Sequence, residues 1–144
     1  MKNLAALLVM IAFVSLSLPV VAQDLPKAAQ YEEGTWYVVT YYKFKSGMTD
    51  EALDLVYKYL VPADKASGRH VIHFDIIVGE WDHVAYFPME GPGDLIWQTE
   101  PSYVKLVQEL ARQGGMERVQ ELDKYESYID FSRSEVVLRR KMDE

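Results

Sequence analysis

The chain has 144 residues, a formal net charge of −7 and no cysteine. A chain of this length supports one domain with its own core, and a negative charge without a basic cluster argues against nucleic acid or an anionic membrane as a partner. The lack of cysteine excludes disulfides, thiol chemistry and a lipid-anchored lipoprotein.

Residues 1–22 have the pattern of a secretory signal peptide. Lys2 supplies the positive start, "LAALLVMIAFVSLSL" the apolar segment, and Val20 and Ala22 the small residues of a cleavage site. An uncleaved membrane anchor is the alternative, because the apolar run from 4 to 22 is about long enough to span a bilayer. Pro19 and the cleavage-like end favour removal after Ala22. We therefore expect an exported protein, periplasmic or extracellular, with no membrane association after cleavage.

Residues 23–34 lack periodicity and are expected to be a tether in front of a single domain at 35–144. The domain begins with "TWYVVTYYKFK", whose aromatic and β-branched residues predict a strand over 35–45. A helix should follow, with Thr49 as its cap and Asp50 and Glu51 in its first turn. Pro62 predicts the end of this helix.

The stretch "GRHVIHFDIIVGEWDHVAYF" (68–87) predicts two strands joined by a tight turn at Gly79-Glu80. A second helix starts near Ser102 and is split at Gly114-Gly115, and "YIDFSRSEVVLRR" closes the chain as a strand. Apolar residues at helical spacing predict the buried stripe of this split helix: Val104, Val107, Leu110, Val119, Leu122 and Tyr125.

The element order β-α-β-β-α-β predicts an α+β, ferredoxin-like fold, an antiparallel sheet with helices on one face. A bare, aromatic-rich sheet face in a small domain is usually covered by a second copy. The segments "VVTYYKFKSGMTDEAL" and "GGMERVQELDKYESYIDFSRSEV" resemble the dimeric α/β-barrel superfamily over most of the domain. The resemblance implies a homodimer whose two sheets close around a central cavity. The superfamily includes cofactor-free monooxygenases, polyketide cyclases, lactone isomerases, haem-degrading enzymes and binding proteins.

The three histidines His70, His73 and His83 do not predict a metal site. Successive side chains of a strand point to opposite faces, so His70 and His73 are separated. With a two-residue turn at Gly79-Glu80, His83 pairs with Ile76 and lies roughly 20 Å from His70 along the strands. Three converging ligands are therefore not expected, and no metal or other cofactor is predicted.

The same register pairs His73 with Tyr86 and places Asp75 beside His73 on the bare face. We expect His73 to be the candidate acid or base, Asp75 to orient it and Tyr86 to donate a hydrogen bond. Ile72 and Phe74 should face the helices. Further side chains expected to line the cavity are Tyr37, Tyr41, Lys43, Ile77 and Val84. A polar patch at a wet dimer interface is the alternative reading of His73, and a three-residue turn would separate Tyr86 from it.

Three functions fit this reading, and they leave open whether the protein is an enzyme. The favoured one is an exported protein that binds a small apolar or aromatic molecule in the cavity of a homodimer. The second is a cofactor-independent isomerase, cyclase or monooxygenase that uses His73, Asp75 and Tyr86. The third is an interaction module whose bare sheet face meets a different protein.

Overall fold

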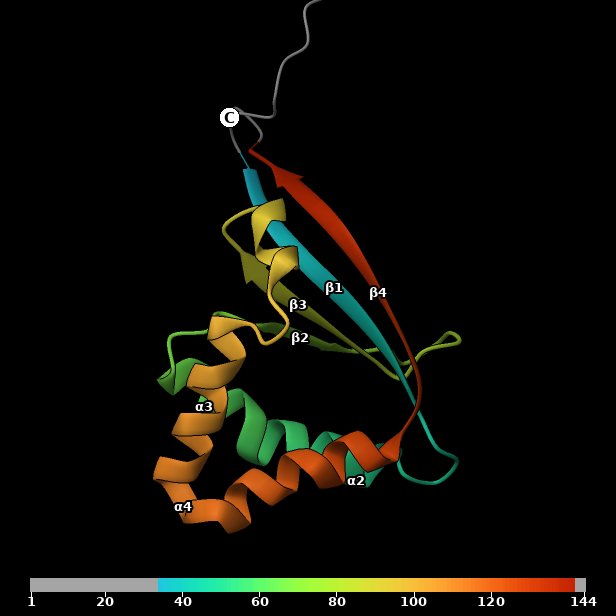
Figure 1. The fold of residues 1–144 in the computed structure, drawn as a ribbon. Coiled ribbons are helices and arrows are strands. Elements are labelled where there is room, and N and C mark those ends of the chain that lie inside the picture. Colours follow the sequence, from blue (N-terminus) through green and yellow to red (C-terminus); the bar gives the residue numbers. More distant parts are fainter. Residues whose placement is uncertain (1–33, 142–144) are drawn as a thin grey trace, which may run out of the picture. The chain divides into compact units, whose positions relative to one another are not determined.

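The computed structural model describes residues 34–141 (Figure 1). Its helices and strands follow the expected order, strand, helix, two strands, helix, strand. The predicted signal peptide and the tether up to residue 33 lie outside the described residues. Within 34–141, no helix combines the length and apolar character needed to cross a membrane.

The sheet has the ferredoxin-like strand order, which confirms the predicted α+β fold. Strands β2 (Ile72–Asp75), β3 (His83–Met89), β1 (Gly34–Phe44) and β4 (Ile129–Arg140) lie side by side in that order, and all neighbours are antiparallel. The two central strands are β3 and β1, as the split β-α-β connections of this fold require. The first and last strands begin within a residue of where their β-branched and aromatic composition placed them.

The first helical segment is longer than expected. It runs through α2 (Thr49–Leu55), a π-helical turn η1 (Val56–Leu60) and α3 (Val61–Ala66). Met48 precedes it, so Thr49 is the first helical residue and the predicted capping role was wrong. Pro62 does not end the helix, because it falls in the first turn of α3, where a missing N–H is tolerated directly after the widened π turn.

The hairpin of β2 and β3 differs from the predicted one by one residue in register. Residues 76–82 connect the strands, His73 pairs with Ala85, and Asp75 pairs with His83. Asp82 holds this connection against β1: its backbone N–H donates to Tyr42 O at 2.9 Å, and its Oδ2 accepts from Phe44 N at 2.8 Å. The predicted turn at Gly79-Glu80 was therefore wrong, because a contact with another strand sets the register.

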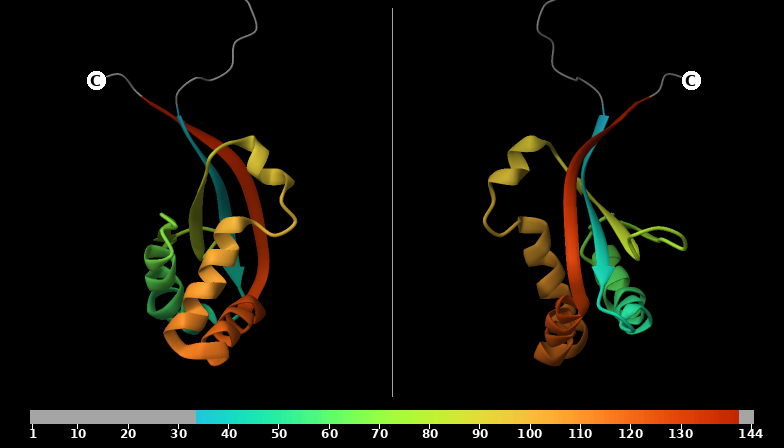
Figure 2. Two further views of the ribbon diagram at one scale, coloured as in Figure 1. Left: turned by 60° about the vertical axis from the view of Figure 1, so that its left-hand side comes forward. Right: turned by 90° about the vertical axis from the view of Figure 1, so that its right-hand side faces the viewer.

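The second helix, α4 (Pro101–Tyr128), is broken where the sequence predicted. Gly114 is extended at φ −159°, and Gly115 has φ +67° and ψ −163°, a conformation that favours glycine. A short 3₁₀ turn, η2 (Pro92–Ile96), precedes α4. The left view of Figure 2 shows α4 lying in front of the strands, with the α2–α3 segment beside it. Of the predicted stripe, Leu110, Leu122 and Tyr125 are buried, whereas Val104 is exposed and Leu106 is buried instead.

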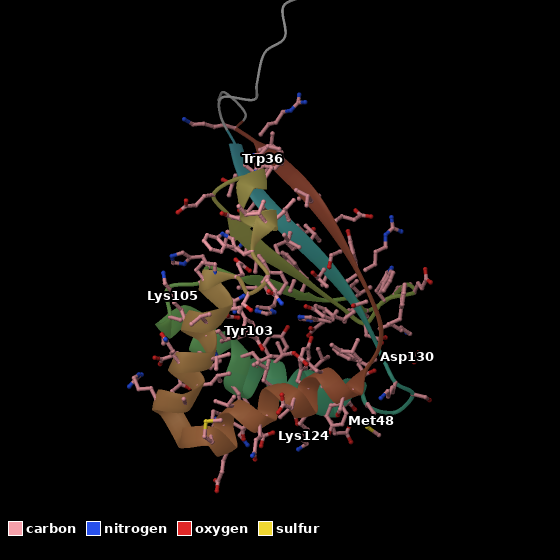
Figure 3. All side chains as sticks on the ribbon, in the orientation of Figure 1. Trp36, Met48, Tyr103, Lys105, Lys124 and Asp130 are labelled. Carbon is pink, nitrogen blue, oxygen red and sulfur yellow. The ribbon has the colours of Figure 1, made fainter. Side chains whose placement is uncertain are left out.

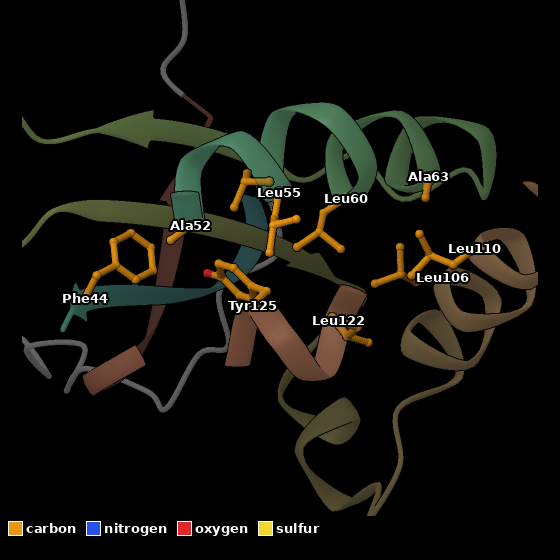
Figure 4. Packing of buried hydrophobic residues seen from close by; sticks show 10 residues of the cluster. Phe44, Ala52, Leu55, Leu60, Ala63, Leu106, Leu110, Leu122 and Tyr125 are labelled. Atoms are coloured by element: carbon orange, nitrogen blue, oxygen red, sulfur yellow. The ribbon is translucent and has the colours of Figure 1, made fainter. Parts of the chain in front are cut away.

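The core lies between the two helical segments and the lower end of the sheet. Figure 4 shows Leu55 and Leu60 directed toward Tyr125 and Leu122 of α4. Phe44 of β1 packs edge to face against Tyr125, with ring centroids 6.0 Å apart. The other sheet face carries no helix, and we call it the open face. Its central side chains are Tyr37, Val39 and Tyr41 of β1, Val84 and Tyr86 of β3, and Ile72 and Phe74 of β2.

Candidate functional site

A cavity of about 320 Å³ lies between the sheet and the helices that cover it. Its apolar wall includes Val56, Leu60, Ala85, Phe87, Leu106 and Leu122, and its polar wall includes Asp64, Arg69, His73, His83 and Glu126. Three tyrosines, Tyr42, Tyr103 and Tyr125, complete much of the lining. Tyr103 and Glu126 are exposed and mark the rim, and Tyr103 is labelled on the first half of α4 in Figure 3. A mostly apolar cavity with a few grouped polar residues is the usual form of a small-molecule site.

The polar wall is a hydrogen-bonded chain across β2 and β3. Because His73 pairs with Ala85 and Asp75 with His83, all four side chains share the face toward the helices. His73 Nδ1 lies 3.1 Å from His83 Nε2, and His83 Nδ1 lies 3.0 Å from Asp75 Oδ1. The two imidazole rings are stacked with centroids 5.3 Å apart. His83 has no exposed surface.

The carboxylate at one end of this chain fixes the protons along it. Asp75 Oδ1 accepts from the Tyr57 hydroxyl at 2.8 Å, so the bond to His83 needs a proton on His83 Nδ1. Burial, the largest influence, lowers the pKa of His83 and favours the neutral ring, whose Nε2 is then an acceptor. His73 consequently donates from Nδ1. In the neutral ring its Nε2 carries the lone pair.

The other end of the chain faces Asp64 and Arg69. The Asp64 and Arg69 side chains are 6% and 9% exposed, and Arg69 Nη1 lies 2.9 Å from Asp64 Oδ1 as an ion pair without hydrogen-bond geometry. His73 Nε2 is 3.6 Å from Asp64 Oδ2, too far for a good hydrogen bond. Among protein atoms, His73 Nε2 and Asp64 Oδ1 are therefore buried without a hydrogen bond. Both residues belong to the cavity wall.

The tyrosines of the site are kept protonated. Burial raises the pKa of Tyr42 to about 12 and also raises the pKa of Tyr125. Desolvation, reinforced by the hydrogen bond to Asp75, raises the pKa of Tyr57 to about 12. All three side chains are therefore neutral at physiological pH and act as hydroxyl donors or apolar walls.

The structure brings His73 and Asp75 into one network, but on the other face of the sheet and through His83: Asp75 bonds His83 and does not orient His73 directly. Tyr86 pairs with Ile72 and lies on the open face, where its ring contacts Phe74 at 5.8 Å between centroids. The predicted grouping of His73 with Tyr86 was therefore wrong, as was the expectation that Ile72 and Phe74 face the helices. The reason is the one-residue difference in register, since a shift of one residue exchanges the faces of a strand.

The side chains predicted to line a cavity on the bare face have different surroundings. Tyr37, Tyr41 and Val84 do lie on the open face, where the Tyr37 ring contacts Tyr86. Lys43 Nζ donates to Asp82 Oδ1 at 2.9 Å, which holds the connection between β2 and β3. Ile77 lies in that connection and is 89% exposed, so it is not part of the sheet.

Four residues of the site were missed in the sequence: Tyr57, Asp64, Arg69 and His83. Asp64 had a usable signal, because it follows Val56 and Leu60 at intervals of four residues and so continues their buried helical stripe. Ending the helix at Pro62 concealed that periodicity. His83 was placed on the opposite face from His73 by the wrong register. No grouping of three His, Asp or Glu side chains suited to a metal ion occurs within residues 34–141.

Comparison with known proteins supports the fold. No protein-family model matches the sequence, and no curated protein matches it. A NIPSNAP family protein of unknown function from Agrobacterium tumefaciens has a similar structure, with a TM-score of 0.53, 12% identity, and coverage of 81% of this chain and 97% of its own. A second NIPSNAP family protein from that organism has a TM-score of 0.52 and 13% identity, covering 72% and 91%.

A dimeric ferredoxin-like protein from an uncultured marine organism is more distant, with a TM-score of 0.46, 11% identity and coverage of 79% and 95%. At these identities the two NIPSNAP structures show a shared fold and nothing further. The expected ferredoxin-like fold is confirmed at that level.

Proposed function

We propose that this protein binds a small, mainly apolar molecule in the cavity between its sheet and its helices, with one polar group of that molecule placed at His73 and Asp64. The observation that carries the proposal is His73 Nε2, a buried polar atom without a hydrogen bond at the wall of a cavity of about 320 Å³. A buried polar group left unsatisfied costs about 1–3 kcal/mol. A ligand that reaches this atom recovers that cost, and the apolar wall supplies the remaining affinity.

This site lies within one protomer, whereas the sequence pointed to a cavity between two sheets. The homodimer remains part of the proposal and uses the open face, where Ile72, Phe74 and Phe131 are substantially exposed. Trp81 stacks on Phe131 with ring centroids 5.4 Å apart, which extends this aromatic surface. A second copy would cover these side chains. The signal-peptide pattern of residues 1–22 supports export, so we propose that the ligand is met outside the cytoplasm.

Toluene provides a direct test of the cavity. We expect it to shift the amide NMR signals of residues around His73, Ala85 and Leu106. Ala85→Leu should remove this binding, because Ala85 lines the cavity and the added side chain would fill it. Ala66→Leu is the matched control, since Ala66 is exposed at the end of α3 and should leave toluene binding unchanged. Shifts confined to open-face residues such as Tyr37 and Tyr86 would contradict the proposed location.

Catalysis is the second candidate, and the chain Asp75–His83–His73 favours it. A histidine with a fixed tautomer and a free Nε2 toward a cavity has the arrangement of a general base. The reaction would be an isomerisation, a cyclisation or an oxygenation without a bound cofactor. Conversion of the molecule that the cavity binds into a product with a different NMR spectrum, lost in His73→Gln, distinguishes an enzyme from a binding protein.

A further inference from the structure

We infer that the polar group of the ligand is a hydrogen-bond donor, a hydroxyl or an amine, and not a carboxylate or phosphate. The inference rests on the proposed binding function and specifies its ligand. Two observations carry it: the atoms of the cavity wall that lack a hydrogen bond are acceptors, and the charges beside them disfavour an anion.

The two buried wall atoms without a hydrogen bond, His73 Nε2 and Asp64 Oδ1, are both acceptors. His73 gives its Nδ1 proton to His83, so the Nε2 of the neutral ring can only accept. Asp64 Oδ1 is a carboxylate oxygen and accepts as well. The His73 and Asp64 side chains are 10% and 6% exposed, so bulk water has little access to either. Acceptors on both sides require a donor from the ligand.

The charges of the cavity wall point the same way. Two lining residues, Asp64 and Glu126, are negative. Among residues 34–141, Arg69 is the only Lys or Arg that lines the cavity. Arg69 is engaged with Asp64, and its guanidinium also lies over the Phe87 ring, 5.6 Å from the centroid. An anion would therefore meet the carboxylate of Glu126 and no uncommitted cation, which disfavours its binding.

A hydroxyl and an amine satisfy the same acceptors, and the wall suits both. A neutral hydroxyl needs only the donor position between His73 and Asp64. An ammonium group would gain in addition from the negative charge of Glu126 and of the Asp64 carboxylate that would accept its hydrogen bond. Both groups donate a hydrogen bond, and an experiment can distinguish them.

Four probes with one ring and different polar groups test the inference: benzyl alcohol, benzylammonium, toluene and benzoate. Their affinities for the wild-type protein can be measured by NMR titration of the cavity residues. We expect at least one donor probe to bind about tenfold more tightly than toluene, the order expected for a hydrogen bond to a charged or strongly polar acceptor. Benzoate should bind most weakly. Preference for the alcohol or for the amine identifies the donor.

Three outcomes would overturn the inference. If benzoate binds most tightly, the ligand is an anion, and the proposed cavity function still stands. If toluene equals both donor probes, the polar atoms do not contribute, and the cavity is purely apolar. If no probe shifts the cavity residues, the proposed function itself falls, and the inference with it.

Substitutions assign the effect to the two acceptors. His73→Phe removes the acceptor, so the affinity for the better donor probe should fall to that for toluene. The ring volume is retained, so the affinity for toluene should change by less than about twofold. His70→Phe is the control, since His70 is exposed and outside the cavity lining. If His73→Phe does not fold, Asp64→Asn is the second variant. It should weaken benzylammonium relative to benzoate, whereas Asp54→Asn on the exposed side of α2 should not. If the folded His73→Phe and Asp64→Asn variants rank the affinities of the probes as the wild type does, the inference is contradicted.

Discussion

His83 is a titratable ring with no exposed surface, held between His73 and Asp75. Burial is the largest influence on its pKa and lowers it, and the charge of a protonated His73 lowers it further, while Asp75 acts in the opposite direction. The folded protein therefore binds a proton at His83 less readily than the unfolded chain does. The stability that neutral His83 provides is complete above its unfolded pKa of about 6.5 and is lost as the pH falls below that value.

We expect the free energy of unfolding to decrease between about pH 7 and pH 5, with a contribution from His83 of up to about 1.4 kcal/mol per pH unit. In His83→Asn this contribution disappears, because the amide does not titrate, so the pH dependence should be shallower. Urea denaturation over a pH series measures both curves. His70→Asn is the control, since His70 is exposed, and its curve should parallel the wild type. Parallel curves for wild type and His83→Asn would exclude this role.

The break in α4 sets the position of two walls of the cavity. Tyr103 and Leu106 come from the first half of the helix, and Leu122 and Tyr125 from the second. Gly115 joins the halves in a backbone conformation, φ +67° and ψ −163°, that side chains with a Cβ rarely adopt. The angle between the halves therefore depends on this residue.

Gly115→Ala should destabilise the protein by about 1–3 kcal/mol, the cost of holding a non-glycine residue in this region. Chemical denaturation gives the value. Gly93→Ala is the matched control, because no atom lies within 4 Å of the added Cβ and Gly93 is not at positive φ. Its free energy of unfolding should stay close to that of the wild type. Equal losses in the two variants would show that the kink does not require glycine.

Patterns within one element predicted the strands β1 and β4 and the glycine break of α4, because they depend on local composition and spacing. The hairpin of β2 and β3 could not be predicted in this way. Its register is held by Asp82, which contacts Tyr42 and Phe44 on β1, and nothing in the sequence of the hairpin encodes that distant contact. His73 and Asp75 remained together because residues two apart on a strand share a face in either register. Both lie on the helix-covered face beside His83 and not on the open face beside Tyr86.

At the scale of the molecule, the open face is a sheet surface that the helices leave uncovered. Phe74 and Tyr86 form an aromatic pair on it, and Tyr37 contacts Tyr86 from β1. Asp64 lies in α3 and Arg69 in the connection from α3 to β2, so both reach the cavity through the position of the first helical segment, which packs against α4. Sequence reasoning could thus predict an aromatic sheet face, but not a polar wall assembled from a helix and a hairpin.

We expect the wild-type protein to sediment as a dimer at micromolar concentration and Phe74→Glu to sediment as a monomer, because the substitution buries a charge within the proposed contact. Leu95→Glu is the matched control: Leu95 is 55% exposed, close to the 53% of Phe74, but lies in η2, away from the open face. It should remain dimeric. A monomeric wild type would refute the homodimer and favour a hetero-partner on this face. A dimeric Phe74→Glu variant would show that the dimer contact does not include Phe74.

The hydrogen-bonded chain of His73, His83 and Asp75 reaches the solvent at Asp75. Asp75 is 34% exposed and Tyr57 is 45% exposed, whereas His73 and His83 are enclosed. A proton gained at His73 Nε2 can be passed on by release of the Nδ1 proton to His83 and of the next proton to Asp75. This route crosses from β2 to β3 and back and ends at Asp75, which, like Tyr57, is not part of the cavity lining. A ligand in the cavity would therefore leave this route to the solvent open, and His73 could still exchange protons with bulk water.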